Sequence, residues 1–117
     1  MAIVKVAEIG EEAAARFLRR RGYAILARNW RIPLGELDIV ARRGRTLVFV
    51  EVKARRSSDF LDPAEGVDWA KQARLRRLAA AYLAIEGPEF TDCRFDVVSV
   101  LVGAKGPVIR HLPGAFS

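Results

Sequence analysis

The segment of residues 47–53, LVFVEVK, constrains the fold of this chain more than any other. Its first four residues are apolar and three of them are β-branched or aromatic, which is typical of a strand buried on both faces. Glu51 and Lys53 then follow inside the same run. Because a carboxylate or an ammonium group leaves water only at a cost of several kcal/mol unless it is partnered, these charges need an explanation. The segment predicts a central strand with charged groups at one end.

The remaining pattern predicts an α/β fold of order αβββαββ, with a single mixed central sheet and flanking helices in one domain, 1–117. The first three strands should form an antiparallel meander. Helices are expected at 8–21, ended by Gly22, and at 64–85, ended by Gly87 and Pro88. Strands are expected at 23–31, 36–42, 46–54, 93–102 and 107–112, with a loop at 55–63.

The chain is basic, and the excess lies in its first half. The formal net charge is +6; residues 1–60 contain 13 Lys and Arg against 7 Asp and Glu, whereas residues 61–117 contain 7 of each. Most of the cations are arginines, whose planar fork matches phosphate oxygens. The positive charge favours an anionic partner, and nucleic acid is the first candidate.

Several other functions have little support in the sequence. The only cysteine, Cys93, and the only histidine, His111, give no disulfide, no zinc spacing and no Cys/His or Ser/His constellation, so we expect packing or surface roles for both. No apolar run approaches the roughly 18 residues that span a bilayer. We read no signal peptide at residues 1–12 and expect a cytoplasmic protein with no membrane partner.

Strand alternation brings two carboxylates together. Pairing outward from the turn at Gly44 makes Asp38 and Glu51 cross-strand or diagonal neighbours, roughly 5–8 Å apart. Two carboxylates that close repel unless one is protonated or a cation lies between them. The predicted faces are Leu47, Phe49, Glu51 and Lys53 against Val48, Val50 and Val52 in one strand, and Glu36, Asp38 and Val40 against Leu37, Ile39 and Ala41 in the other.

Both helices direct polar groups toward the same end of the sheet. Glu11 falls on the packing stripe of the first helix, whereas Glu12 falls on the solvent side. The apolar stripe of the second helix extends back to Lys71 and Gln72, and Arg74 lies off it on a basic outer face. Two interpretations remain open: a site in which Asp38, Glu51 and Glu11 bind a divalent cation, and an internal salt-bridge cluster of Glu51, Lys53, Asp38 and an arginine.

The sequence resembles a known family over residues 10–100. GELDIV, followed 13 residues after its aspartate by EVK, is similar to the core motif of PD-(D/E)XK nucleases, with Leu37 in place of the motif's proline. Together with GEEAAARFLRRRGY, ARNWRIPLGELDIV, LVFVEVKARR and RFDVVSV, it resembles the YraN-like family of small bacterial proteins. That family is similar to archaeal Holliday-junction resolvases and to restriction-endonuclease-like folds. The resemblance implies Mg²⁺ or Mn²⁺ held by Asp38, Glu51, the Val52 carbonyl and Glu11, with Lys53 assisting the attacking water and Lys71 or Gln72 as a polar helix position.

We therefore expect a divalent-metal-dependent DNA endonuclease, with branched or flapped DNA among its candidate substrates. The alternatives are a non-catalytic nucleic-acid-binding module that works with a partner, and a basic accessory protein of an RNA-containing assembly. DNA is favoured over RNA, and the analogy with resolvases suggests a homodimer. Trp30 and Trp69 could each stack on bases or be partly buried in the core, and Arg94 and Asp96 suggest a structural pair. The expected nucleic-acid contacts are Arg28, Trp30, Arg31, Arg55, Arg56 and Arg74.

Overall fold

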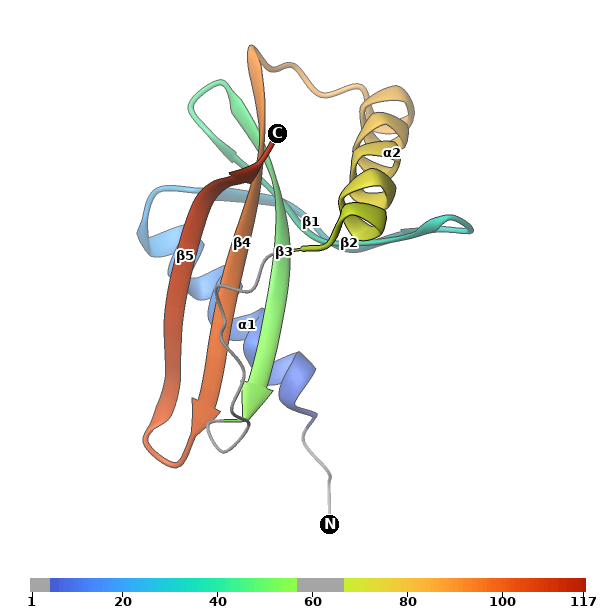
Figure 1. The fold of residues 1–117 in the computed structure, drawn as a ribbon. Helices are drawn as coiled ribbons and strands as arrows, with labels where there is room; N and C mark the ends of the chain where they lie inside the picture. The colour runs from blue at the N-terminus through green and yellow to red at the C-terminus, as the bar shows by residue number, and fades with distance from the viewer. Residues whose placement is uncertain (1–4, 57–66) are drawn as a thin grey trace.

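One five-stranded sheet carries the fold, with a helix on each face (Figure 1). The computed structural model describes residues 5–56 and 67–117, so most of the predicted loop at 55–63 lies outside the described residues. The elements are α1 (Val6–Arg20), β1 (Ala24–Ile32), β2 (Gly35–Arg43), β3 (Thr46–Arg56), α2 (Trp69–Glu86), β4 (Asp92–Gly103) and β5 (Gly106–Phe116).

The strands follow one another across the sheet in chain order, β1 to β5. Pairing is antiparallel except between β3 and β4, which run parallel for eleven residue pairs, from Thr46↔Asp92 to Arg56↔Val102. A parallel pair needs a crossover connection, and α2 lies in that connection. The predicted order αβββαββ and the antiparallel meander of the first three strands are confirmed, and the architecture is consistent with a restriction-endonuclease-like fold.

The core consists of two apolar layers, one under each helix. Alternation along β3 supplies both layers, since Val48 and Val50 pack beneath α1 while Leu47 and Phe49 pack beneath α2. All four side chains are buried, as the apolar run predicts. The charged end of β3 therefore emerges from a strand whose position is fixed on both faces.

Gly10 sets how closely α1 approaches the sheet. A Cβ atom at this position would lie 2.3 Å from the Cβ of Ala54 on β3, a distance that packed side chains do not tolerate. Glycine removes that clash and lets the helix backbone rest directly on the strand. The next residue is Glu11, so this contact also fixes where the Glu11 side chain enters the structure.

Leu37 departs from the predicted strand faces. Strict alternation would place it with Ile39, but Leu37 packs with Val40 in the layer under α2, whereas Ile39 lies under α1. Asn29, on the neighbouring strand between the pairs Arg28↔Ile39 and Trp30↔Leu37, has a left-handed φ of 52°. The break in alternation between Leu37 and Ile39 therefore lies opposite this residue.

Two other boundaries differ from the prediction. The sequence predicts the start of α2 at residue 64; residues 64–66 lie outside the described residues, and residues 67 and 68 are not helical. Asp68 caps α2 instead, because its side chain accepts the Lys71 N–H at 2.8 Å. Strand β5 is longer than expected and reaches Phe116, since pairing with β4 resumes after a register shift between Phe95 and Val97. Among the described helices, neither is long and apolar enough to cross a membrane.

Candidate functional site

Asp38 and Glu51 meet where β2 leaves β3. The pairing of these strands runs from Arg43↔Thr46 to Ile39↔Val50, and the next residue on each strand is a carboxylate. Figure 1 shows the β1–β2 hairpin turning away here while β3 continues beside β4. The Val52 N–H donates to Asp38 Oδ2 at 2.9 Å, so a side chain takes the place of a backbone ladder bond. The predicted neighbour relation is present.

The surroundings of Asp38 disfavour its ionised form. Burial, together with the negative charge of Glu51, raises the pKa of Asp38 to about 7, although the Val52 N–H favours the ionised form. A hydrogen bond with Glu51 and the charge of Glu11 raise it further. Such a pair of carboxylates attracts cations.

Lys71 is the cation that Glu51 meets in this structure. Its Nζ atom lies 2.9 Å from Glu51 Oε1, and the Glu51 side chain is only 9% exposed. Lys71 therefore reaches the end of the sheet that the stripe on α2 predicts. The ion pair also gives the salt-bridge interpretation partial support, with Lys71 as the partner of Glu51.

The predicted catalytic side chains border one cavity of about 420 Å³. Four elements contribute to it: α1, β2, β3 and the start of α2. Its lining contains both carboxylates and cationic side chains, which suits a ligand that carries both negative charge and a bound cation. The charged residues predicted for the site that line it are Glu11, Asp38, Glu51, Lys53, Arg55 and Lys71.

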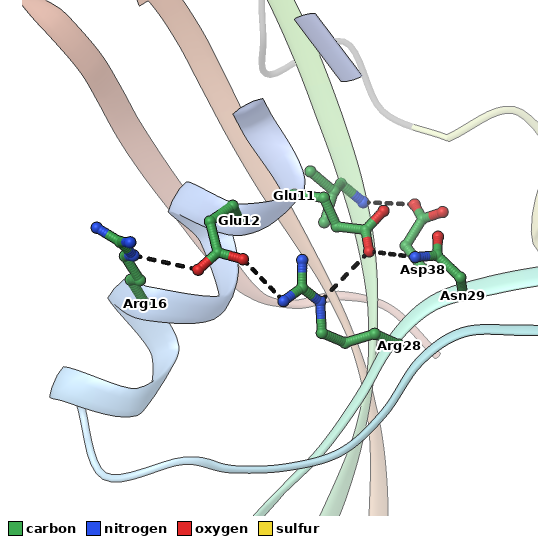
Figure 2. Close-up of polar contacts among 7 residues, drawn as sticks. Glu11, Glu12, Arg16, Arg28, Asn29 and Asp38 are labelled. Atoms are coloured by element: carbon green, nitrogen blue, oxygen red, sulfur yellow. Dashed lines mark hydrogen bonds and ion pairs between the residues drawn. The ribbon is translucent and has the colours of Figure 1, made fainter. Parts of the chain in front are cut away.

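Glu11 points into this region but is held by β1 (Figure 2). Its Oε1 atom accepts the Asn29 side-chain N–H at 2.7 Å and lies 3.5 Å from Arg28 Nε. Glu12 points the other way, toward Arg16 at 3.1 Å and Arg28 Nη1 at 2.9 Å. The side chains are 15% and 45% exposed respectively, so the predicted difference between the two glutamates is confirmed.

The donor set fits a hard divalent cation better than a soft one. Mg²⁺ and Mn²⁺ prefer oxygen ligands, and Mg²⁺ commonly uses one or two protein carboxylates with water in the remaining positions. Asp38 and Glu51 supply such a pair. Within residues 5–56 and 67–117, no group of three or more His, Cys, Asp or Glu side chains is gathered closely enough to hold a metal ion. Glu11, the predicted third ligand, is held by Arg28 and Asn29 in this structure.

The predicted nucleic-acid contacts fall into two groups. Arg55, Arg56 and Arg74 are exposed, and Arg55 lines the cavity. Arg28 and Arg31 have carboxylate partners within the protein. Arg28 bridges to the two glutamates of α1, and Arg31 Nη2 lies 2.8 Å from Glu36 Oε2.

The two tryptophans have opposite environments. Trp30 packs edge-on against Tyr82, with ring centroids 5.2 Å apart, and joins the layer under α2. Partial burial is therefore the outcome for Trp30. For Trp69, partial burial was an open alternative and is wrong, because this side chain is 80% exposed.

Sequence reasoning missed Asn29 as part of the site. It lies beside Asp38, and its amide group holds Glu11 (Figure 2). A signal was available, since asparagine is depleted in strands and is among the residues that best tolerate positive φ. Asp68 was also missed; it lines the cavity and caps α2.

A second buried polar cluster lies on β4 and β5, and its role is structural. Asp96 is fully buried and accepts two hydrogen bonds from Arg94, at 2.8 and 2.9 Å, which confirms the predicted pair. His111 Nε2 lies 2.7 Å from Asp96 Oδ2, and the Gly114 N–H donates to Asp96 Oδ1 at 2.9 Å. Burial opposes ionisation of Asp96, but these bonds outweigh it and lower its pKa. The His111 ring packs against Phe17 and Tyr23, as expected for a core residue.

The fold and this site together define a mixed α/β protein of restriction-endonuclease-like architecture, with an acidic pair at the point where β2 and β3 diverge. The sequence profile of the Uncharacterised protein family UPF0102 matches residues 10–100, and the chain belongs to this family. The resemblance to YraN-like proteins is thereby confirmed.

Relatives match along almost the whole chain. A UPF0102 protein of Symbiobacterium thermophilum is 54% identical over 113 residues, which are 96% of this chain and 96% of that protein. One from Moorella thermoacetica is 50% identical over 111 residues, 93% of this chain and 92% of its own length. One from Dictyoglomus thermophilum is 42% identical over 114 residues, 96% and 97% of the two chains.

Proposed function

We propose that this protein is an endonuclease that hydrolyses phosphodiester bonds in DNA with a bound Mg²⁺ or Mn²⁺ ion. The observation that carries the proposal is the pair of Asp38 and Glu51 in a cavity also lined by Lys53, Lys71 and Arg55. A protein that only bound nucleic acid would gain nothing from two carboxylates facing phosphate. The same pair is what a divalent cation between protein and phosphate requires.

Each side chain has a role that its chemistry supports. Asp38 and Glu51 would hold the ion, with the Val52 carbonyl as a further ligand. When bound, the ion activates a water molecule and neutralises charge on the phosphate. Lys53, two residues beyond Glu51 on β3, would orient the attacking water or stabilise the transition-state charge. Hydrolysis forms one P–O bond to the water oxygen and breaks the bond to the leaving oxygen, which takes up a proton.

The surrounding arginines would position the substrate backbone. Arg55 and Arg56 continue β3 beyond the carboxylates, and Arg74 lies on the exposed face of α2. Contacts of this kind hold phosphates without reading base sequence. They support binding to nucleic acid in general, with DNA as the favoured substrate.

One observation favours a second candidate, a non-catalytic nucleic-acid-binding module on the same fold. Lys71 already neutralises Glu51, and Arg28 with Asn29 already engages Glu11. A site that satisfies its own charges can persist without a metal. In that case the protein would bind nucleic acid through its arginines and act with a partner.

A cleavage screen separates the two candidates. Wild type and Asp38→Asn are incubated with Mg²⁺, Mn²⁺ or EDTA and with single-stranded, duplex, flapped and four-way DNA, or RNA; binding is recorded on the same samples. Asp92→Asn is the matched control, because Asp92 is exposed and pairs with Thr46 at the far end of β3.

The nuclease proposal predicts cleavage that needs a divalent cation, survives in Asp92→Asn and is lost in Asp38→Asn. Binding without cleavage in every sample would overturn it in favour of the binding module. Cleavage that persists in Asp38→Asn would show that the carboxylate pair is not the reactive centre.

A further inference from the structure

Trp69 places an aromatic ring in water, and no ring or cation contact holds it within the described part of the chain. Its side chain is 80% exposed, against 66% for Val108, the next most exposed large apolar side chain among the described residues. Helical geometry explains why the core does not cover it. Residue 69 lies six positions before Leu75 of the buried stripe, roughly 120° away around α2 at 3.6 residues per turn. The ring therefore contributes little to packing the fold.

Hydrogen bonds hold the backbone before and after Trp69. Val67 is buried in the layer under α2, and its carbonyl accepts the Gln72 side-chain N–H at 2.7 Å. Asp68 caps the helix through the Lys71 N–H, and its carbonyl accepts the Gln72 N–H at 2.9 Å. Trp69 is thus presented on a fixed first turn, which limits the entropy lost when the ring binds a partner.

Trp69 belongs to the first turn of α2, and that turn borders the cavity. Asp68 and Lys71, one residue before and two residues after Trp69, both line it. Lys53 and Arg55 line the same cavity from β3. Cations that follow a phosphate backbone next to an exposed aromatic ring are the combination by which proteins bind single-stranded nucleic acid.

We propose that Trp69 stacks on an unpaired base of the nucleic acid whose backbone enters the cavity. This inference rests on the proposed function and specifies its substrate as single-stranded nucleic acid, or a junction or flap with unpaired bases beside the phosphate in the site. In an intact duplex both faces of each base are covered by neighbouring bases, so the indole finds no free face except at an end or at a flipped base.

The two tryptophans allow a fluorescence test that does not depend on cleavage. Trp30→Phe leaves Trp69 as the only tryptophan, and Trp69→Phe leaves Trp30, which packs on Tyr82. Each variant is titrated, with Ca²⁺ or EDTA in place of Mg²⁺, with a single-stranded oligothymidylate, an oligouridylate and a closed hairpin duplex. We expect quenching of Trp69 emission by the single strands and no quenching of Trp30 emission.

Affinity provides a second readout in the otherwise wild-type chain. Trp69→Ala should lower affinity for the single strands roughly 5- to 150-fold, the usual loss for one base–aromatic stack, and leave duplex affinity unchanged. Because the ring is exposed, the unfolding midpoint should not move. The DNA and RNA strands show which sugar is preferred.

The outcomes separate this inference from the nuclease proposal. Quenching without cleavage supports stacking and assigns it to a binding module. Cleavage by wild type without quenching, or equal losses of single-strand and duplex affinity in Trp69→Ala, overturns the stacking inference and leaves the nuclease proposal intact. A chain that binds no nucleic acid in any arm contradicts both.

Discussion

Asp38→Asn should stabilise the metal-free protein at alkaline pH. In the folded state the pKa of Asp38 is about 7, whereas the ordinary value is 3.8. Between these values the folded protein retains a proton that the unfolded chain has released, so wild-type stability falls as the pH rises and is lowest above about pH 7. Asparagine does not titrate, and its side-chain oxygen can still accept the Val52 N–H. The variant should therefore escape this loss.

The magnitude follows from the two pKa values. A difference of about three units corresponds to on the order of 4 kcal/mol at 1.36 kcal/mol per unit, which is a ceiling. Lys71 forms an ion pair with Glu51 and offsets part of the repulsion on Asp38, so we expect a gain of about 1–3 kcal/mol. Below about pH 4 the gain should vanish, since aspartate is then protonated in both states.

Urea denaturation in EDTA, followed by circular dichroism at about pH 5 and pH 8, measures this difference. Asp92→Asn controls for the loss of one exposed negative charge in a basic protein and should change stability little at either pH. If Asp38→Asn is less stable than wild type at pH 8, the carboxylate is part of a stabilising salt-bridge cluster, and the account of a repelling pair is refuted.

Three further predictions concern the framework of the site. Asp96→Asn should lower the free energy of unfolding by about 2–4 kcal/mol near neutral pH, because it weakens a buried charged network. Since folding lowers the pKa of Asp96, this difference from wild type should shrink below about pH 4, which urea titrations at several pH values measure. Glu11→Gln should reduce any cleavage rate by about tenfold or more while Glu12→Gln has little effect, so equal rates would contradict the assigned orientations. Gly10→Ala should destabilise the fold by about 1–3 kcal/mol in the same denaturation assay, because the new methyl group collides with Ala54; an unchanged midpoint would mean that α1 can shift freely.

The sequence predicted the sheet well because its strands carry strong local signals. The apolar run before Glu51 identifies a strand buried on both faces, and the turn at Gly44 sets its register with β2 closely enough to bring Asp38 beside Glu51. The two faces of α1 separate Glu11 from Glu12 by periodicity alone. These features depend on residues near one another in the chain.

The errors occur where distant segments decide the outcome. Leu37 leaves the alternating pattern opposite Asn29, a left-handed residue in the adjacent strand, and no alternation pattern in β2 reveals this. The bond between Asp96 and His111 forms because β4 and β5 pair across a register shift. Partial burial was one of the two interpretations of Trp69, and it is wrong because the angle of Trp69 around α2 turns the side chain toward water.

The partners of the site charges were also beyond sequence reasoning. Glu51 was expected either to bind a cation or to pair with Lys53, and in this structure it meets Lys71 across the space between β3 and α2. Arg28 is predicted to lie on a nucleic-acid-binding edge, and in this structure it also bridges to Glu11 and Glu12. The packing of both helices decides which cation reaches which carboxylate, and the local sequence pattern does not determine that packing.

Manganese binding tests most directly whether the Asp38–Glu51 pair is a divalent-cation site. The electron paramagnetic resonance signal of free Mn²⁺ is followed as wild type, Asp38→Asn and Asp92→Asn are added at about pH 8, and Mg²⁺ is then used as a competitor. We predict saturable binding to wild type and Asp92→Asn that Mg²⁺ displaces, and no binding to Asp38→Asn. Equal binding by wild type and Asp38→Asn, or no binding by wild type, would contradict the account.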